Sequence, residues 1–347
     1  MKCAGLSILL LGAAGFAAAQ GPKAGTVARE GAWLEVCLTE AADYSAVYPA
    51  KVLPSGGATR EVAAVLRLGK GESYATMNAA WIAAEVPGTQ PGFVINRIEM
   101  DLRGKDRAVV RFKHPQGLLA GKYRVEITAQ GKPWKNSEFR LAPVAAPEVS
   151  RPTDLVALTP GTVRRYALTQ EFGRNIRPTL PPGVKLDADG RFRASVTETV
   201  VKADALGAHV ETRQNNVLAD EEWLRLTDAG LVIVKIRSGG EESSFDPPHT
   251  LWPWPLTTPK EWFYEPDDKS YRQRFRMWGP VAIKGPAGEG PGYVVLMEQP
   301  SSDVALSVER QYLPGIGVVR ETITQARNGV LLTRTDRVLT AMPSRAP

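Results

Sequence analysis

Cysteine and histidine are scarce in this sequence, with two Cys and three His among 347 residues. No two of His114, His209 and His249 have the i, i+4 spacing that places a zinc-binding pair on one helix face. Cys3 lies in a segment that we expect to be removed, so only Cys37 remains. A thiolate zinc cluster and an internal disulfide are therefore excluded. Cys37 follows an apolar stretch and is expected to be a small buried strand residue, the alternative being an intermolecular disulfide.

Sequence motifs of common enzymes are also missing. The chain has no Gly-x-Ser-x-Gly elbow, no Ser-x-x-Lys, no Walker loop and no dinucleotide fingerprint. We therefore expect neither catalysis nor a cofactor. A pair of glycosidase carboxylates leaves no local signature, so a glycan-acting enzyme stays open as an alternative.

Apolar runs long enough to span a membrane are lacking. Residues 4–19 form a run of 16, against the roughly 20 that a spanning helix needs. The run follows Lys2 and ends in three alanines, a pattern typical of a signal peptide over residues 1–19. We expect an exported protein, periplasmic or extracellular, with no transmembrane segment after cleavage. Cys3 precedes the run and Cys37 lies well beyond it, so a lipid anchor is not expected.

No strong excess of one charge is present. The formal net charge is +6, and the basic residues are scattered, so no nucleic-acid partner is expected. Arg272, Arg274 and Arg276 alternate and would share one strand face. That face is interpreted as solvated, with attraction to anionic envelope polymers as the alternative.

Glycine and proline are abundant, with 32 Gly and 27 Pro, which favours many turns. Short alternating apolar runs over residues 26–142 predict β-strands at 75–85, 94–102, 107–112, 121–127 and 137–141. So many short strands indicate a sandwich. The Ala80–Ala83 stretch, with Trp81 and Ile82, and the later Gly121–Glu126 stretch resemble strands of bacterial immunoglobulin-like modules. That resemblance implies an immunoglobulin-like β-sandwich with a spacer or adhesive role.

An Ala- and Pro-rich segment, residues 143–152, is expected to be a linker. After it, alternating runs predict strands throughout residues 153–342, in two β-rich halves that would form one wide, partly open barrel. A short echo supports two halves. Residues 158–161 precede Tyr166, and residues 256–259 precede Tyr264 at the same offset.

The segment from Tyr312 to Glu321 is the most distinctive. It resembles the Tyr-x-Pro-Gly-Val-Gly-x-Val element of an uncharacterised exported bacterial domain family. Gly161, Tyr166, Pro255, Leu256 and Trp262 match that family's earlier elements, while Lys260 and its neighbours depart from them.

The family resemblance implies a β half-barrel, similar to those of periplasmic lipoprotein carriers, which hold an acyl chain in a concave apolar sheet. It implies a ligand cavity and no catalytic residue. Independently of it, Pro314, Gly315 and Gly317 are suited to a structural turn, since proline presets one torsion and glycine accepts positive φ.

Aromatic residues concentrate in one region, because five of the eight Trp fall between residues 223 and 278. As candidate ligand-binding residues we take Trp252, Trp254, Trp262, Tyr264 and Trp278. Proline on either side of Trp254 favours extended backbone, with Trp252 and Trp254 on the same side. They would stack on sugars or line an acyl cavity, or else fill one end of the barrel as core.

Asp187 and Asp189 have the spacing of part of a calcium loop, but the remaining acidic ligands are missing, so a hairpin turn is predicted and no metal. Together these features favour an exported, non-catalytic protein whose C-terminal half-barrel binds an apolar or amphipathic ligand. The alternatives are a structural or adhesive envelope protein and a glycan-acting enzyme. The expected partner is a lipid, a glycan or an envelope protein.

Overall fold

The computed structural model is almost entirely β, as the sequence predicts. It describes residues 31–41, 45–55, 60–173, 176, 178, 185–258, 260–301, 303–327 and 330–345, so the predicted signal peptide lies outside the described residues. Within these ranges the single helical element is the 3-10 helix η1, Pro152–Asp154, and no helix is present that could cross a membrane.

The described residues form two compact units. One comprises residues 31–146 and Trp278–Ala282, and the other comprises Pro147–Met277 and the chain from Ile283 onwards. The division after Ala146 falls inside the segment 143–152 expected as a linker.

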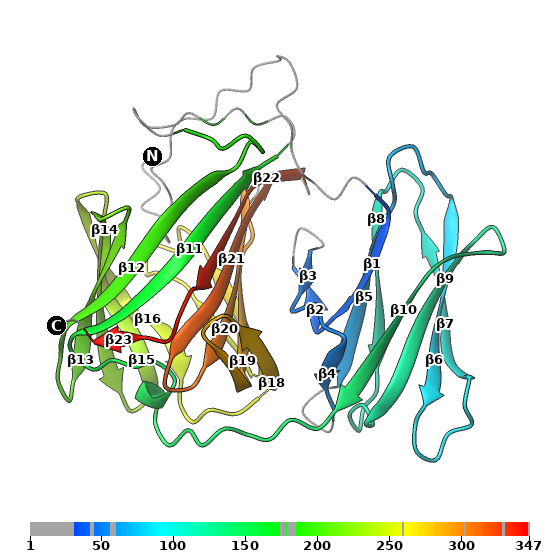
Figure 1. Ribbon diagram of the computed structural model, residues 1–347, viewed down its shortest axis with the longest axis horizontal. Helices are drawn as coiled ribbons and strands as arrows, with labels where there is room; N and C mark the ends of the chain where they lie inside the picture. The colour runs from blue at the N-terminus through cyan, green and yellow to red at the C-terminus, as the bar shows by residue number, and fades with distance from the viewer. Residues whose placement is uncertain are drawn as a thin grey trace. The chain divides into compact units, whose positions relative to one another are not determined.

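The N-terminal unit contains ten strands, drawn from blue to green in Figure 1. These are β1 (Trp33–Cys37), β2 (Thr39–Glu40), β3 (Ala46–Val47), β4 (Val52–Pro54), β5 (Glu61–Arg67), β6 (Thr76–Glu85), β7 (Phe93–Asp101), β8 (Arg107–Lys113), β9 (Gly121–Ala129) and β10 (Lys132–Ala142). They form a three-stranded sheet β1-β5-β8, a five-stranded sheet β4-β10-β9-β6-β7 and the pair β2-β3.

Aromatic side chains join the two larger sheets. Trp81 of β6 stacks on Phe112 of β8 with ring centroids 5.6 Å apart. The two sheets therefore pack face to face as a β-sandwich. The strand prediction for residues 75–85 is confirmed by β6, and Cys37 is a fully buried residue of β1, as expected. The specific immunoglobulin-like topology stays a prediction.

The C-terminal unit is built on one large antiparallel sheet whose strands wind round a common interior (Figure 1). Its strands are β11 (Thr162–Phe172), β12 (Phe192–Ala203), β13 (Gly207–Gln214), β14 (Val217–Thr227), β15 (Gly230–Ser238), β16 (Glu241–Pro253), β17 (Lys260–Tyr264), β18 (Gln273–Gly285), β19 (Gly288–Gln299), β20 (Ala305–Leu313), β21 (Gly317–Arg327), β22 (Val330–Leu339) and β23 (Ser344–Arg345).

Two successive six-strand meanders make up this sheet. Strands β11 to β16 follow one another in space, as do β17 to β22, and the halves join where β11 pairs with β22. Tyr166 lies in the first strand of the first half and Tyr264 in the first strand of the second. The sequence echo therefore falls on equivalent strands of the two halves.

The free edges of the sheet, β16 and β17, meet through side chains. The Trp262 indole N–H donates to the backbone oxygen of Thr250 over 3.2 Å. The His249 Nε2 lies 3.0 Å from Oε1 of Gln273, and the His249 ring packs edge-on against Tyr264 at 4.6 Å. We call these five residues the seam. Because of the seam, the sheet is nearly closed, more so than the partly open barrel expected from the sequence.

The interior of the sheet follows from strand alternation. Along β18 the residues Gln273, Phe275 and Met277 are buried and alternate with more exposed neighbours. Equivalent positions on the other strands complete one apolar cluster that includes Val210, Trp252, Tyr293, Val308, Tyr312 and Ile323. We call this cluster the barrel core.

Candidate functional site

Three of the five predicted aromatic residues come together. Trp252 is 1% exposed and packs edge-on against Tyr312, with ring centroids 4.4 Å apart. Tyr264 is also buried in the barrel core, and Trp262 packs against it, stacked on Phe275 at 5.1 Å. Trp252 is therefore a wall of the interior, and Trp262 and Tyr264 hold the seam closed.

The other two aromatic residues lie elsewhere. Trp254 follows the end of β16, is half-buried and lies outside the barrel core, with its backbone N–H donating to Ala229. Trp278 alternates with Met277 along β18 and so belongs to the opposite face of the strand. The sequence could not show this difference, because it depends on the strand phase.

The predicted structural turn holds the segment that carries η1. The N–H of Gly315 donates to the backbone oxygen of Asp154 over 2.7 Å, and Arg164 Nε donates to Ile316 over 2.8 Å. Gly315 has a φ of 75° and Gly317 a φ of 101°, in the region that favours glycine. Leu155, which follows η1, is fully buried in the barrel core. Residues 149–160, the η1 segment, are thus fixed to the interior of the sheet.

Charged and polar side chains interrupt the apolar interior in two rows across the sheet. Arg337, Glu321 and Arg310 lie directly opposite one another on β22, β21 and β20. The second row runs over β11, β12, β13 and β14. Its members are Arg164, Glu198, Thr212 and Asp220. Cross-strand neighbours of this kind are close enough to interact.

Ion pairs connect the rows. Arg337 Nη1 lies 3.0 Å from Oε1 of Glu198, and its Nε lies 3.3 Å from Oε1 of Glu321. Arg310 Nε donates to the other Glu321 oxygen over 2.5 Å. Burial opposes ionisation of Glu321, but the charges of Arg337 and Arg310 outweigh it and hold the pKa of Glu321 below its usual range.

One carboxyl in this region has no such partner. Glu222 of β14 makes no hydrogen bond or ion pair with any described residue. Burial is the largest influence on Glu222 and raises its pKa to about 7. Arg310 and Arg337 lower it, while Glu198 and Asp220 raise it. A carboxyl with such a pKa is partly protonated at neutral pH and is a common feature of functional sites.

Glu222 lines a small cavity, which we call the chamber. Its volume is about 100 Å³, enough for about three water molecules at about 30 Å³ each. Its polar wall contains Arg310, Glu321 and Arg337, and its apolar wall contains Leu158, Leu231 and Trp252.

A second cavity of about 290 Å³, the mouth, lies against the η1 segment and residues 203–207. Leu158 and Leu231 line both cavities and so separate them. The barrel core fills the interior around these two cavities, which are lined by described residues. Both are small, and polar residues form part of the lining of each.

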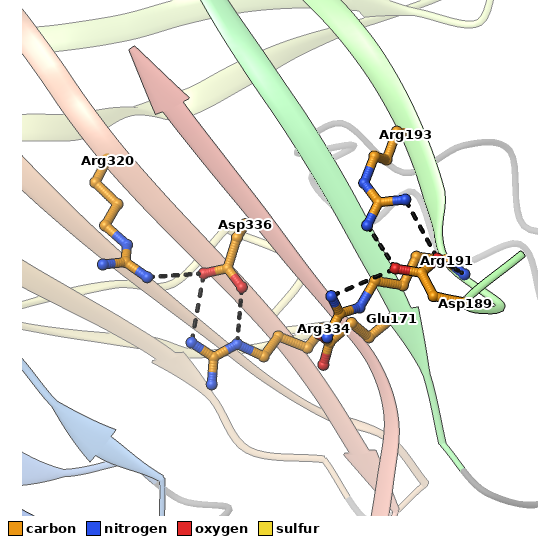
Figure 2. Close-up of polar contacts among 7 residues, drawn as sticks. All are labelled: Glu171, Asp189, Arg191, Arg193, Arg320, Arg334 and Asp336. Carbon is orange, nitrogen blue, oxygen red and sulfur yellow. Dashed lines mark hydrogen bonds and ion pairs between the residues drawn. The ribbon is translucent and has the colours of Figure 1, made fainter. Parts of the chain in front are cut away.

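The opposite face of β22 carries a different charge network, shown in Figure 2. Asp336 pairs with Arg334 at 3.0 Å and with Arg320 at 3.5 Å. In the same view, Asp189 pairs with Arg193 at 2.6 Å, and Arg191 pairs with Glu171 at 2.6 Å. Every carboxylate drawn has an arginine partner, so this network explains local structure without a ligand.

Asp187 and Asp189 form a turn, as predicted, closed by Gly190 N–H donating to Asp187 over 2.9 Å. Both carboxylates contact Arg193. Within the described part of the chain, no three or more His, Cys, Asp or Glu side chains lie close enough together to hold a metal ion.

The sequence analysis did not identify the charged residues of the chamber, although their positions within the strands are unusual. Arg310 stands between Val308 and Tyr312 at a core position of its strand, and Glu321 stands likewise between Val319 and Ile323. A charge in the buried phase of an amphipathic strand is rare unless it is paired. Several such positions on different strands would have indicated a shared interior site.

No protein-family model matches the sequence, and neither does any protein of curated function. Among solved structures, it is similar to a protein from Bacteroides fragilis, assigned as exported and with a YmcC-like fold. The identity is 14%, with 54% of this chain and 97% of that chain covered, and the TM-score is 0.27. It is also similar to a protein from Parabacteroides distasonis assigned as a lipoprotein. For this protein the identity is 17%, with 53% of this chain and 96% of that chain covered, and the TM-score is 0.23. TM-scores this low do not establish a common fold, so neither fold nor function is transferred.

Proposed function

We propose that the protein is an exported, non-catalytic binding protein. Its C-terminal sheet holds a small amphipathic ligand, with the polar group in the chamber and the apolar part towards the mouth. The observation that carries this proposal is Glu222, a carboxyl that makes no hydrogen bond or ion pair with any described residue and lines a cavity inside the sheet. Polar groups inside a protein are normally hydrogen-bonded to protein or water, so a cavity-lining carboxyl without a protein partner marks a place where a bound molecule can supply one.

The two cavities together suit such a ligand better than either does alone. The chamber offers charged groups on one side and Trp252 and Leu251 on the other. The mouth approaches the lower end of the range of about 300–1,000 Å³ that is usual for small-molecule sites. A shift of Leu158, the residue shared by both, would join them into one pocket. Leu158 lies on the η1 segment, whose anchor is the Pro314–Gly317 turn.

Catalysis on a glycan is the competing function for the same residues. A carboxyl with raised pKa beside ionised carboxylates is the pattern of a glycosidase acid and its partner. Here Glu198 and Glu321 are already engaged by arginines. A chamber with room for a few water molecules also leaves little space for a sugar ring between the carboxyls. Binding is therefore the function we favour.

The test blocks the passage between the cavities. Leu158→Trp fills the mouth side of the chamber, while Leu218→Trp places the same indole at a position that is 43% exposed. Both variants and the wild type are purified from the envelope of the cells that naturally produce the protein. They are examined by native mass spectrometry, and bound molecules are then identified under denaturing conditions. We expect a small molecule on the wild type and on L218W, and its loss on L158W.

Two results would count against the proposal. A molecule retained equally by L158W would place the ligand elsewhere. A protein partner recovered by cross-linking, with no small molecule on any variant, would favour the structural or adhesive function instead.

A further inference from the structure

The interior charges are unequal in number once the ion pairs are counted. Three guanidinium groups, those of Arg164, Arg310 and Arg337, share two ion-paired carboxylates, Glu198 and Glu321. Of the remaining acids that line the chamber, Glu222 makes no hydrogen bond or ion pair with any described residue, and Asp220 lies opposite Ser238 of β15. Burial disfavours the charged form of both. Whenever both acids hold a proton, the three guanidinium groups exceed the two ion-paired carboxylates by one positive charge.

Arg310 is the arginine whose positive charge a molecule in the chamber could contact. Its Nε donates to Glu321, and its positive charge acts on the Tyr312 hydroxyl. The contact with Glu321 uses one of the five donors of an arginine. The Arg310 side chain is 20% exposed, against 7% for Arg337, and it lines the chamber. Arg310 thus has donors left for a bound group.

Glu222 complements Arg310 in its protonated form. A protonated carboxyl has one O–H donor, whereas an ionised one only accepts. The charged groups that influence the pKa of Glu222 are Arg310, Arg337, Glu198 and Asp220, which come from β20, β22, β12 and β14. The two arginines attract an anion, and a protonated Glu222 adds a hydrogen bond to it.

We infer that the chamber binds the carboxylate of an amphipathic monocarboxylic acid, held by the Arg310 guanidinium and by a hydrogen bond from protonated Glu222. This rests on the proposed function and specifies its ligand class. A carboxylate of the ligand would give Arg310 a second anionic partner beside Glu321. The mouth, reached past Leu158 and Leu231, then takes the acid's apolar chain.

Calorimetric titration of the purified mature protein tests the inference with three probes. Decanoate carries both the head and the chain, acetate carries the head alone, and 1-decanol carries the chain alone. We expect decanoate to bind at pH 6 and about tenfold more weakly at pH 8, because a carboxyl with a pKa near 7 loses most of its protons over that interval. Decanoate itself is ionised at both pH values. Acetate binding as tightly as decanoate would instead identify a site for short free acids.

Two variants separate the residue roles. Arg310→Gln should weaken decanoate about 10- to 100-fold, the usual effect of losing a charge-assisted hydrogen bond. Glu222→Gln keeps a neutral donor at every pH, so it should bind decanoate at pH 8 about as tightly as the wild type does at pH 6. Arg310→Lys serves where the glutamine variant fails to fold, and Arg274→Gln, on an exposed ion pair with Glu261, is the matched control.

The outcomes distinguish the two proposals. If decanol and decanoate bind equally, with no effect of Arg310→Gln, the carboxylate site is wrong and the amphipathic pocket stands. If decanoate binds more tightly at pH 8 than at pH 6, Glu222 does not donate to the head. If no probe binds and native mass spectrometry also finds no ligand, both proposals fall.

Discussion

Replacing Glu321 by Gln tests whether the interior charge row stabilises the fold. Glu321 is 2% exposed and lies between two guanidinium groups, with Arg310 Nε at 2.5 Å and Arg337 Nε at 3.3 Å. Glutamine has nearly the same volume, so no cavity is created. The change removes the negative charge and leaves three interior arginines with Glu198 as their one ion-paired carboxylate. Removing one partner of a buried pair typically costs about 3–5 kcal/mol.

That cost is a large part of the stability of an ordinary domain, which is about 5–15 kcal/mol. With a urea m-value of about 1–3 kcal/mol per M, the unfolding midpoint should fall by about 1–5 M. The assay is urea unfolding at pH 7, followed by the fluorescence of the tryptophans in the C-terminal unit. Because the pKa of Glu321 is depressed in the folded protein, its contribution is present at neutral pH and is lost as the pH falls through that pKa.

Glu261→Gln is the matched control. Glu261 pairs with Arg274 at 2.7 Å, but both side chains are more than 40% exposed, so the loss should be less than about 1 kcal/mol. The reasoning is refuted if E321Q lowers the free energy of unfolding no more than E261Q does.

Two further predictions concern pH. Glu222 has a pKa raised from 4.5 to about 7, so the folded state holds its proton longer than the unfolded state does. Stability should therefore fall as the pH rises from about 4.5 to 7, by about 3 kcal/mol at most, and Glu222→Gln should abolish this component in urea unfolding at several pH values. Burial lowers the pKa of His249 from 6.5 to about 4, so stability should be lost as the pH falls through that window. His249→Gln should remove the loss in the same assay. An unchanged pH profile in either variant would contradict the corresponding assignment.

The strands were largely predictable because they alternate. Along β6 the buried residues Met77, Ala79 and Trp81 recur at every second position, and this period overrides the helical preference of alanine and methionine. The division into two β-rich parts followed from the Ala- and Pro-rich segment between them. Each of these features is local in sequence and could be identified without knowledge of the pairing.

The site was not predictable in the same way because it depends on register. Arg310, Glu321 and Arg337 become neighbours through the pairings of β20, β21 and β22. Glu198 joins them only because β11 pairs with β22 across the two halves of the sheet. A shift of one residue in any of these pairings would turn a charge to the other face. No local pattern fixes such a long-range pairing.

The aromatic cluster illustrates the same limit. Composition singled out residues 223–278 for their tryptophans, but Trp252 and Trp278 lie on opposite sides of their strands, and of these two Trp252 belongs to the interior. The charged residues of the proposed site looked ordinary in the sequence. A charged residue is common in a β-rich sequence and becomes informative when its strand phase places it inside.

The interior charged groups differ in whether an opposite charge of the protein compensates their burial. Arg337, Glu321 and Arg310 form a row in which each charge faces its opposite, so their burial is compensated within the protein. A buried ion pair of this kind is seldom more stabilising than apolar residues of the same size, which makes stability alone a weak reason for it. Glu222 lacks even that compensation, because its neighbours lie beyond ion-pair distance and burial raises its pKa. A protonated carboxyl beside an arginine with unused donors is a poor element of a core. It is a suitable receptor for an anion, and for that reason we place the function of this protein inside the sheet.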